Sequence, residues 1–525
     1  MLPDYHHHEE FRNRTAKLAE IRSMGIDPYP PKFTPTQTAE ALTHKYESHE
    51  LGGSEEAEAG RTESVNLAGR LVLFRGMGKN AFAHLQDSTG RIQLMLNRDH
   101  TQVSGFTPTA ELTPLKFVEK KIDLGDIIGI EGHLFRTHKG ELTVYVKELT
   151  LLCKTLLPLP DKHAGLGRKE LRYRKRWLDL ITHQEVLETF KLRSKIVRLI
   201  RDYFEKAHFM EVETPILQNI YGGAEAAPFI TELNALHQKM YLRIALEISL
   251  KKLIIGGFDR VFEISKIFRN EGLDRTHNPE FTMLEAYAAY WDYNDMMVFT
   301  EKLFEFLALE LFGITQLQVG DNTIDLKAPW IRMSMKEAIR TYGKIDVDTL
   351  SDDQMRTILL DKGGDPKEIK AAPRGLLVAA LFEETAEAHL IQPHHIIDHP
   401  IETTPLCKLH RDPLLRQERF VERFESFICG TEFCNSYTEL NDPELQRQLL
   451  VEQNEKREGG DEEAHPLDEE FIEAICQGMP PTGGLGIGID RLVMLLTKAA
   501  SIRDVLFFPL MRAEEASHEP RSDQV

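Results

Sequence analysis

The sequence predicts a multidomain α+β protein, with a small β-barrel near its N-terminus and a larger antiparallel sheet flanked by helices. Three observations support this fold class. Short stretches with alternating hydrophobic residues follow one another within residues 65–152. Two strand pairs, at 260–290 and 422–442, carry β-branched and aromatic residues around polar turns. Amphipathic segments separate these strands, and 525 residues suffice for about two to four domains.

The composition is that of a globular protein with an acid excess. Hydrophobic residues make up 42% and charged residues 28% of the chain, which is ordinary. The formal net charge of −19 argues against DNA or RNA binding through overall charge, so any RNA contact must use local basic patches. The five cysteines form no C-x-x-C pair, no apolar run is long enough for a bilayer, and no signal peptide is found. We therefore expect a cytoplasmic protein without a membrane partner.

The N-terminal part, residues 1–64, is expected to form a helix and an acidic loop. Phe11, Leu18 and Ile21 recur at roughly helical spacing, and a glycine followed by DPYPP ends that helix. Either the helix packs on its own domain, or its cationic side chains touch RNA; these are Arg12, Arg14, Lys17 and Arg22. Residues 47–63 are acidic and predict a surface loop or a short helix.

Residues 65–155 are expected to form an OB-fold barrel. Turns such as MGKN, STG and HKG separate five strand-like stretches within about 90 residues, as in this fold, whose open face binds single-stranded nucleic acid. Phe82, with Arg75 and Gln93 on adjacent strands, is a candidate for stacking on a base. The alternative for Phe82 is a core aromatic residue.

Residues 156–180 are expected to form a basic linker. Prolines open it, and six Lys or Arg stand against one Glu in residues 168–176. An RNA backbone could cross here, or the arginines could pair with the acidic domain that follows. The C-terminal residues 513–525 hold few apolar side chains and are expected to be disordered.

The large domain is expected to span residues 181–512. A long amphipathic helix within 185–208 leads to a strand, and the glycine pair of YGGAEAAPFIT allows the backbone to approach a small ligand. Residues 241–260 predict a helix that carries Glu247.

Residues 296–345 and 347–392 show mostly helical patterns, with a helical insertion of no evident chemistry at about 341–375. The four histidines of HLIQPHHIIDHP (389–400) could suggest a metal cluster, but the prolines and apolar neighbours favour a strand and a loop. An acidic helix with an exposed break follows between 443 and 478, where a charge run is usually a solvated face.

The stretch RVFEISKIFRNEGLDRTHNPEFTMLEAYAAY (260–290) predicts two strands joined by a polar loop. In the second strand Glu285 and Tyr287 share one face with two apolar side chains, whereas Leu284, Ala286 and Ala288 share the other. A carboxylate and a phenol on a buried strand indicate that something polar binds there. Arg269 and Glu271, near the hairpin tip, are two positions apart and would point to the same side of an extended chain.

Two further blocks complete this pattern. GGLGIGIDRLVMLL (483–496) is a glycine-rich strand that runs into an apolar helix, with Arg491 where the helix begins. ERFESFICGTEFCNSYTELND (422–442) is a strand pair that sets acids among aromatic residues. Glu432 and Asn435 are three positions apart, so on a regular strand their side chains would point to opposite faces. Both reach one face only if a β-bulge or twist intervenes.

These blocks resemble motifs 2 and 3 of the class II aminoacyl-tRNA synthetases, and the segment between them is similar to the bacterial-type lysyl-tRNA synthetases of subclass IIb. FRNEG, the N-x-[YF]-x-E-L-N-D run and G-x-G-I-G-I-D-R carry the resemblance, which covers about residues 60–512. It implies a class II synthetase antiparallel sheet. It also implies activation of lysine with ATP to lysyl-adenylate and pyrophosphate, transfer of lysine to the 3′ end of tRNA(Lys), and a homodimer built by motif 1.

The resemblance also implies roles for individual residues. Arg269 and Arg491 would be the catalytic pair, and Glu425 with Glu432 would bind Mg²⁺ between phosphates. The ATP-binding residues would be Arg269, Glu271, His277, Asn278, Phe281, Glu425, Glu432 and Arg491. The lysine-binding residues would be Gly223, Glu247, Arg269, Glu285, Tyr287, Asn435, Tyr437 and Glu439. The anticodon would be read by Arg75, Phe82, Gln93 and Glu141.

The residues themselves agree with such chemistry. Attack of a carboxylate on the α-phosphate of ATP is limited by charge, so positioning and charge neutralisation suffice. The sequence holds no G-x-x-x-x-G-K-[ST], no G-x-S-x-G and no plausible Cys–His nucleophile. A pocket rich in acids suits an amino acid with an extra positive charge and repels aspartate.

Three alternatives remain at this stage. An aspartyl- or asparaginyl-type tRNA ligase would need a cation in the amino-acid pocket. A non-catalytic tRNA-binding homologue would have lost Arg269, Glu432 or Arg491, and all three are present. A paralogue that lysylates a translation factor typically lacks the OB domain.

Overall fold

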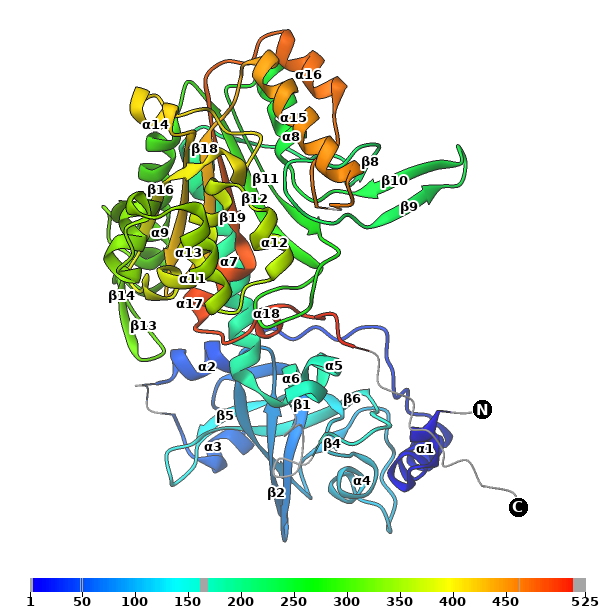
Figure 1. Ribbon diagram of the computed structural model, residues 1–525. Helices are drawn as coiled ribbons and strands as arrows, with labels where there is room; N and C mark the ends of the chain where they lie inside the picture. Colours follow the sequence, from blue (N-terminus) through cyan, green and yellow to red (C-terminus); the bar gives the residue numbers. More distant parts are fainter. Residues whose placement is uncertain (1–2, 48, 50, 161–168, 462, 513–525) are drawn as a thin grey trace, which may run out of the picture. The chain divides into compact units, whose positions relative to one another are not determined.

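A computed structural model describes residues 3–47, 49, 51–160, 169–461 and 463–512 of the chain. The chain divides into two compact units, residues 1–165 and 166–525 (Figure 1). The predictions for the tail 513–525 and for the central part of the linker, 161–168, lie outside the described residues.

The first unit is a closed barrel, which confirms the predicted OB-fold. Its sheet has the order β3-β2-β1-β5-β6, and a parallel pairing of β3 with β6 closes it. Alternate side chains such as Leu67, Leu94 and Val144 fill the barrel because strand residues alternate between its two sides. The strands are β1 (Ser64–Met77), β2 (Asn80–Gln86), β3 (Arg91–Asn97), β4 (Gln102–Val103), β5 (Ile127–Arg136) and β6 (Leu142–Cys153). The helices are α1 (Glu9–Ser23), α2 (Ala39–Lys45), α3 (Ser54–Glu58) and α4 (Pro114–Lys121).

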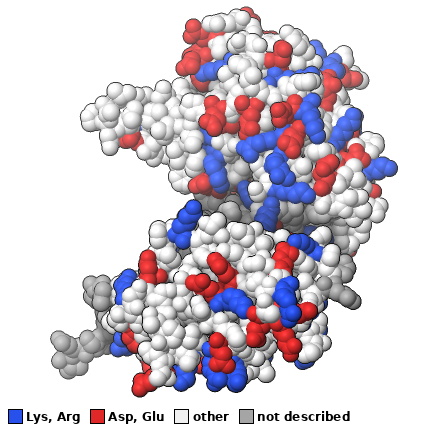
Figure 2. Space-filling model, turned by 180° about the vertical axis from the view of Figure 1, so that it is seen from behind, with Lys and Arg blue, Asp and Glu red and all other residues white. Residues whose placement is uncertain are grey.

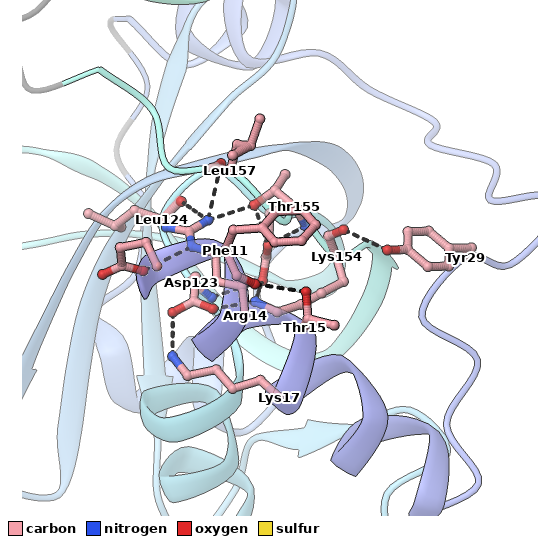
Figure 3. A network of polar contacts seen from close by, with 12 residues as sticks. Phe11, Arg14, Thr15, Lys17, Tyr29, Asp123, Leu124, Lys154, Thr155 and Leu157 are labelled. Carbon is pink, nitrogen blue, oxygen red and sulfur yellow. Dashed lines mark hydrogen bonds and ion pairs between the residues drawn. The ribbon is translucent and has the colours of Figure 1, made fainter. Parts of the chain in front are cut away.

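Helix α1 packs on its own unit, which decides between the two possibilities for two of its cations. Arg14 is buried, and its Nη1 donates hydrogen bonds to the Leu124 carbonyl at 3.2 Å and to Thr155 Oγ1 at 2.9 Å (Figure 3). Lys17 forms an ion pair with Asp123. Neither side chain is therefore free to bind RNA in this arrangement.

Lys154 is the buried centre of the same network. Its side chain has no exposed surface, and its Nζ contacts Asp123 (Figure 3). The same Nζ lies 2.7 Å from the carboxylate of Asp126. Asp126 also accepts hydrogen bonds from the backbone and the hydroxyl of Thr155. Removing one partner of such a buried pair leaves uncompensated charge, which is far more costly than the pair is stabilising.

We expect Lys154→Met to lower the free energy of unfolding of the barrel by about 3–5 kcal/mol. The three tryptophans, Trp177, Trp291 and Trp330, all belong to the second unit, so their fluorescence does not follow the barrel. Urea unfolding measured by far-UV circular dichroism should therefore show an early transition, while the fluorescence transition stays in place. If both transitions are unchanged, the Lys154 network does not stabilise the barrel.

The second unit is built on an eight-stranded sheet of order β15-β16-β17-β18-β19-β12-β11-β7. The six central strands pair antiparallel as predicted, whereas the outermost pairs, β15–β16 and β11–β7, are parallel. Its strands are β7 (Met210–Glu211), β11 (Arg260–Phe268), β12 (Glu280–Ala289), β15 (Ile331–Ser334), β16 (His394–Pro400), β17 (Phe420–Ile428), β18 (Thr431–Thr438) and β19 (Thr482–Gly488). Two smaller sheets comprise β8 (Leu217–Gln218), β9 (Ile230–Leu233) and β10 (Gln238–Leu242), and β13 (Gln316–Val319) with β14 (Asn322–Asp325).

Helices cover one face of the large sheet. Side chains of α7, α9 and α17 join the apolar face of β12 and β19 in one core that includes Phe204, Leu303, Leu492, Leu284 and Leu485. The polar face of β12 is therefore left for a binding site. The helices are α5 (Lys169–Arg174), α6 (Arg176–Thr182), α7 (Gln184–Lys206), α8 (Glu247–Ile255), α9 (Tyr293–Phe312), α10 (Met335–Ala338), α11 (Asp352–Asp361), α12 (Pro366–Ala371), α13 (Arg374–Thr385), α14 (Pro413–Gln417), α15 (Pro443–Glu458), α16 (Glu469–Cys476), α17 (Ile489–Thr497) and α18 (Ile502–Val505).

Two predictions for this unit need correction. Residues 296–345 are only partly helical, because β13, β14 and β15 follow α9; their strands are four residues each, too short for a clear alternation. In 241–260 the helix begins only at Glu247, since residues up to Leu242 extend β10.

The basic stretch at 168–176 contributes α5 and α6 within the second unit. Asp179 accepts from Arg172 Nε at 2.6 Å and from Arg176 Nη1 at 2.7 Å. Arg176 is buried and also donates to the carbonyls of Arg503 and Phe507. The contacts of Arg176 with Arg503 and Phe507 favour the second possibility, in which the arginines pair with the domain that follows. On the face shown in Figure 2, charges of both signs are interspersed over this unit.

Among the described helices, none combines the length and the apolar composition needed to cross a membrane.

Candidate active site

A β-bulge shapes the polar face of the sheet. Glu425 lies opposite Asn435 and Ser426 opposite Cys434, but Phe427 lies opposite Glu432, so β18 has one extra residue, Phe433. Phe433 and Cys434 both point into the core. The bulge confirms the prediction made from parity, because Glu432 and Asn435 now line the same cavity.

This first cavity has a volume of about 260 Å³. It lies between β12, β18, β19, the start of α8 and the glycine pair after Tyr221. All eight residues expected to bind the amino acid line it: Gly223, Glu247, Arg269, Glu285, Tyr287, Asn435, Tyr437 and Glu439. Gly223 has a φ of +88°, and a Cβ there would stand 2.9 Å from the Cβ of Glu247, which explains the glycine.

Three buried carboxylates dominate the cavity. Glu285 accepts hydrogen bonds from the backbone N–H of Leu246 at 2.8 Å and from the Tyr287 hydroxyl at 3.1 Å. Burial, together with the nearby charge of Glu247, raises the pKa of Glu285 to about 7, although these two hydrogen bonds oppose the rise. Glu247 accepts from the Tyr437 hydroxyl at 2.5 Å. The cavity is thus rich in negative charge and acceptors.

Glu439 is the carboxylate with the fewest partners. It is 1% exposed, and beyond an ion pair with Lys251 neither of its oxygens has a hydrogen-bond partner among the described residues. Gly484 makes room for it, because a Cβ on Gly484 would lie 1.9 Å from Glu439 Oε1. A buried acceptor without a partner is costly, so this oxygen is suited to an incoming donor.

A second cavity of about 270 Å³ lies beside the first. It is lined by Glu271, His277, Asn278, Phe281 and Arg491, which were expected to bind ATP, together with Arg269 and Glu432. Glu425 lies apart from it and lines the first cavity instead.

Neighbouring groups hold the cations of the second cavity in place. The Arg269 guanidinium stands 5.4 Å from the ring centroid of Phe281. Arg491 Nη1 donates to the Glu432 carbonyl at 2.8 Å, and its Nη2 is 3.2 Å from His277 Nε2. The other ring nitrogen of His277 lies 2.7 Å from the carboxylate of Asp274. Such fixed donors suit a polyanion.

The two cavities share part of their lining. Arg269, Met283, Glu432, Asn435 and Gly486 belong to both. Arg269 is therefore the cation at the boundary, where groups bound in the two cavities would meet.

Glu425 and Glu432 fit a divalent cation. Burial and then the charge of Glu425 raise the pKa of Glu432. A cation placed between these two carboxylates would therefore be favourable. Arg423 donates to Glu425 Oε1 at 2.6 Å and fixes its orientation. Two carboxylates can hold such a cation where phosphate oxygens and water complete its shell.

Four residues of the first cavity or its wall were missed from the sequence. Lys251 has a signal in retrospect, since it follows Glu247 by four residues on a helix. Arg423 lies two residues before Glu425 on β17, so its side chain points to the same face of the sheet. His465, in the segment between α15 and α16, and Gly484 have no sequence signal that marks them for this cavity.

The outer face of the barrel gathers the four predicted anticodon residues. Phe82 lies opposite Arg75 on β1 and packs, half-buried, on a small cluster outside the barrel core that includes Met95 and Tyr145. Gln93 Nε2 donates to Glu141 at 2.8 Å on the same side. The aromatic ring therefore does not belong to the barrel core.

The histidines between 389 and 400 belong to the fold. His394, His395 and His399 lie buried on β16, and their hydrogen-bond partners include the Gln392 carbonyl, the Ser426 hydroxyl and the Ile396 carbonyl. This confirms the strand that was favoured over a metal cluster.

The chain is similar to known proteins over nearly its whole length. A family model described as tRNA synthetases class II (D, K and N) matches residues 168–512, and an OB-fold nucleic acid binding domain matches residues 65–152. The chain therefore belongs to the class II tRNA synthetases of the D, K and N group.

Similar proteins from three organisms are each named lysine–tRNA ligase. The one from Chlamydia caviae is 58% identical over 523 residues, covering 98% of this chain and 99% of that protein. The one from Staphylococcus epidermidis is 46% identical over 505 residues, covering 96% and 98%. The one from Methanoculleus marisnigri is 46% identical over 496 residues, covering 94% of each.

Proposed function

We propose that this protein is a lysine–tRNA ligase, which forms lysyl-adenylate from lysine and ATP and then transfers lysine to the 3′ end of tRNA(Lys). The observation that carries the proposal is the pair of adjoining cavities, one with three buried carboxylates and one with cations and an aromatic ring, which share Arg269.

In the first cavity the substrate is recognised by its charges. Glu439 and the Tyr287 hydroxyl receive the ε-ammonium, Glu247 receives the α-amine, and Asn435 with Arg269 holds the carboxylate. Glu285, Tyr437 and Gly223 complete the wall. Aspartate or asparagine would leave the carboxylates of this cavity without a counter-charge, which disfavours the aspartyl- and asparaginyl-type alternative.

In the second cavity ATP is bound with its α-phosphate next to Arg269. The Phe281 ring and the Arg491 guanidinium enclose the adenine, Glu271 accepts from its amino group, and His277 with Asn278 faces the phosphates. Glu425 and Glu432 would hold Mg²⁺, which neutralises phosphate charge when bound. Arg269 can donate to a phosphate oxygen and to the attacking carboxylate at once, so it lowers the repulsion between two anions.

Exchange of pyrophosphate into ATP, with each standard amino acid and no tRNA, tests this function. We expect exchange with lysine alone. Exchange with aspartate or asparagine would contradict the proposed pocket, and no exchange with any amino acid would favour the non-catalytic homologue.

We expect kcat/KM for lysine in this exchange to fall as the pH drops through about 7. Below that pH Glu285 is protonated in the free enzyme and loses its attraction for an ammonium group, whereas above it the carboxylate is ionised. Glu285→Gln should remove this limb and lower activity at all pH values. Glu280→Gln, on the exposed part of the same strand, should retain the limb. An unchanged profile in Glu285→Gln would assign the titration elsewhere.

The barrel is the proposed anticodon-binding domain. An exposed Arg75 beside the half-buried ring of Phe82, with Gln93 and Glu141 nearby, offers stacking and hydrogen bonds to a base. Phe82→Ala should raise the KM for tRNA(Lys) in aminoacylation by about tenfold or more, since one stacked base contributes roughly 1–3 kcal/mol. Exchange without tRNA should be unchanged; if it falls equally, the residue acts on folding instead.

A homodimer is the proposed assembly. The β9–β10 ribbon projects from the second unit (Figure 1), and every residue of β9 is exposed. Ile230 and Leu236 on this ribbon and Met210 on β7 are 59%, 67% and 53% exposed, more apolar surface than water favours. A second copy of the chain would cover it. Sedimentation should show a dimer, and Leu236→Glu with Ile230→Glu should yield monomers; a monomeric parent protein contradicts the assembly.

A further inference from the structure

Lys251 is a completely buried cation behind the amino-acid pocket. Its side chain has no exposed surface, and its Nζ lies 2.5 Å from Glu247 Oε1 and in contact with Glu439 Oε2. It is not among the residues that line the first cavity. Lys251 thus joins two pocket carboxylates, one on α8 and one after β18, without lining the cavity itself.

Besides Glu247 and Glu439, no carboxylate among the described residues forms an ion pair with Lys251. The rings of Tyr437 and Phe471 lie 5.6 Å and 5.8 Å from its Nζ. Burial, and then the charge of Lys251, lowers the pKa of His465 to about 4, so this imidazole is neutral near pH 7. Burial likewise raises the pKa of the Cys407 thiol, which stays protonated. The two carboxylates are therefore what stabilises the buried ammonium.

Lys251 and the two carboxylates stabilise each other's charges. Burial raises the pKa of Glu439, and Lys251 is the strongest influence that lowers it again. Burial acts to lower the pKa of Lys251, but the attraction of Glu247 and Glu439 outweighs it. Glu247 has a second partner in the Tyr437 hydroxyl, whereas Glu439 has none besides Lys251 among the described residues.

We propose that Lys251 is a positioning residue of the amino-acid pocket, whose ammonium group fixes Glu247 and Glu439 relative to each other before the substrate binds. The inference rests on the proposed roles of these two carboxylates. Glu439 Oε2 faces Lys251, while Oε1 faces the position next to Gly484 on the cavity wall. One oxygen is thus held and the other is left for the ε-ammonium of the substrate.

Lys251 also sets the charge of the pocket. The carboxyl groups of Glu247, Glu285 and Glu439 stand against its single positive charge, so the pocket carries an excess of two negative charges once all three are ionised. Lysine brings two ammonium groups, while its carboxylate faces Arg269. An amino acid with one ammonium group would leave a buried charge unpaired, so the resident cation contributes to specificity as well as to position.

The test compares Lys251→Met and Lys251→Arg with the parent enzyme in ATP–pyrophosphate exchange without tRNA. The matched control is Lys154→Met, which removes another buried lysine held by two carboxylates, in the barrel. Glu439→Gln reports separately on the pocket assignment. The KM values for lysine and for ATP are measured between pH ~6 and ~9, a range in which raised carboxyl pKa values become visible.

We expect Lys251→Met to raise the KM for lysine by about tenfold or more near pH 7 and to leave the KM for ATP within about twofold. The defect should shrink as the pH rises, because loss of the cation raises the pKa of Glu439 further and its carboxyl group regains the charge only as the pH increases. Lys251→Arg should recover most of the affinity. Lys154→Met destabilises only the barrel and should give the KM values of the parent enzyme in this exchange without tRNA.

An unchanged or lower KM for lysine in Lys251→Met overturns the inference, as does an equal rise in both KM values or a defect that is constant with pH. If Glu439→Gln leaves the KM for lysine unchanged, the proposed pocket itself is wrong. If Glu439→Gln is defective and Lys251→Met is not, only the role of Lys251 is wrong. Tryptophan fluorescence monitors folding of this unit, and Lys251→Gln replaces a variant that does not fold, with the same expected result.

Discussion

Replacing Gly484 by alanine is expected to abolish lysine-dependent exchange, by about 100-fold or more, because small displacements at a reacting centre have effects of that size. A Cβ at this position would stand 1.9 Å from Glu439 Oε1 and 2.7 Å from Cε1 of Tyr287. The backbone cannot yield, since Gly484 is paired with Tyr287 on β12 and with Tyr437 on β18. The methyl group therefore displaces the side chains proposed to receive the ε-ammonium.

Gly486 on the same strand provides the matched control. A Cβ there would meet the terminal methyl of Met283 at 3.0 Å, a flexible group that can move aside. Gly486→Ala should therefore lose far less activity than Gly484→Ala. ATP with Mg²⁺ should still raise the melting temperature of Gly484→Ala, because the second cavity is intact. A normal KM for lysine in Gly484→Ala would show that this cavity is not the amino-acid pocket.

Replacing Arg269 by lysine is expected to slow lysyl-adenylate formation by about 100- to 1,000-fold, the usual effect of removing one transition-state donor. Arg269 lies where the two cavities meet, with its Nε 3.3 Å from the Ile244 carbonyl and its guanidinium over Phe281. Lysine retains the charge but cannot donate to two oxygens in one plane. The rate constant should fall in single-turnover measurements, while the KM values for lysine and ATP change much less.

A surface arginine separates this effect from a general loss of charge or stability. Arg447 on α15 pairs with Glu469 at the protein surface, and Arg447→Lys should retain the parent rate. If Arg269→Lys raises the KM for ATP and keeps the single-turnover rate, Arg269 contributes to ground-state binding, and its proposed role in the transition state is wrong.

Several features of this protein follow from local pattern alone. The barrel could be predicted because its strands alternate along residues 65–152 and turn residues separate them. The side chains of β12 that face the site, Glu285 and Tyr287, follow from parity, because neighbouring strand residues always point to opposite sides. Even the bulge between Glu432 and Asn435 was predictable, since two polar residues of opposite parity had to reach one face.

Tertiary structure decided the features that depend on distant partners. Four-residue strands such as β13 and β14 are stabilised by pairing with each other and carry too little alternation to be read alone. Arg14 looks like an ordinary surface cation until the distant Leu124 and Thr155 accept its hydrogen bonds. Lys154 likewise looks like one until Asp123 and Asp126 pair with it in the fold.

The pocket shows the same division. The sequence determined which acids, phenols and cations are available, and their spacing placed most of them on one sheet face. Only the folded chain brings Lys251 against Glu439, 188 positions later, and sets Gly484 beside the same carboxylate. The physical reason is that burial strengthens the interaction between charges and shifts their pKa values. Burial depends on what packs around a residue rather than on its neighbours in sequence.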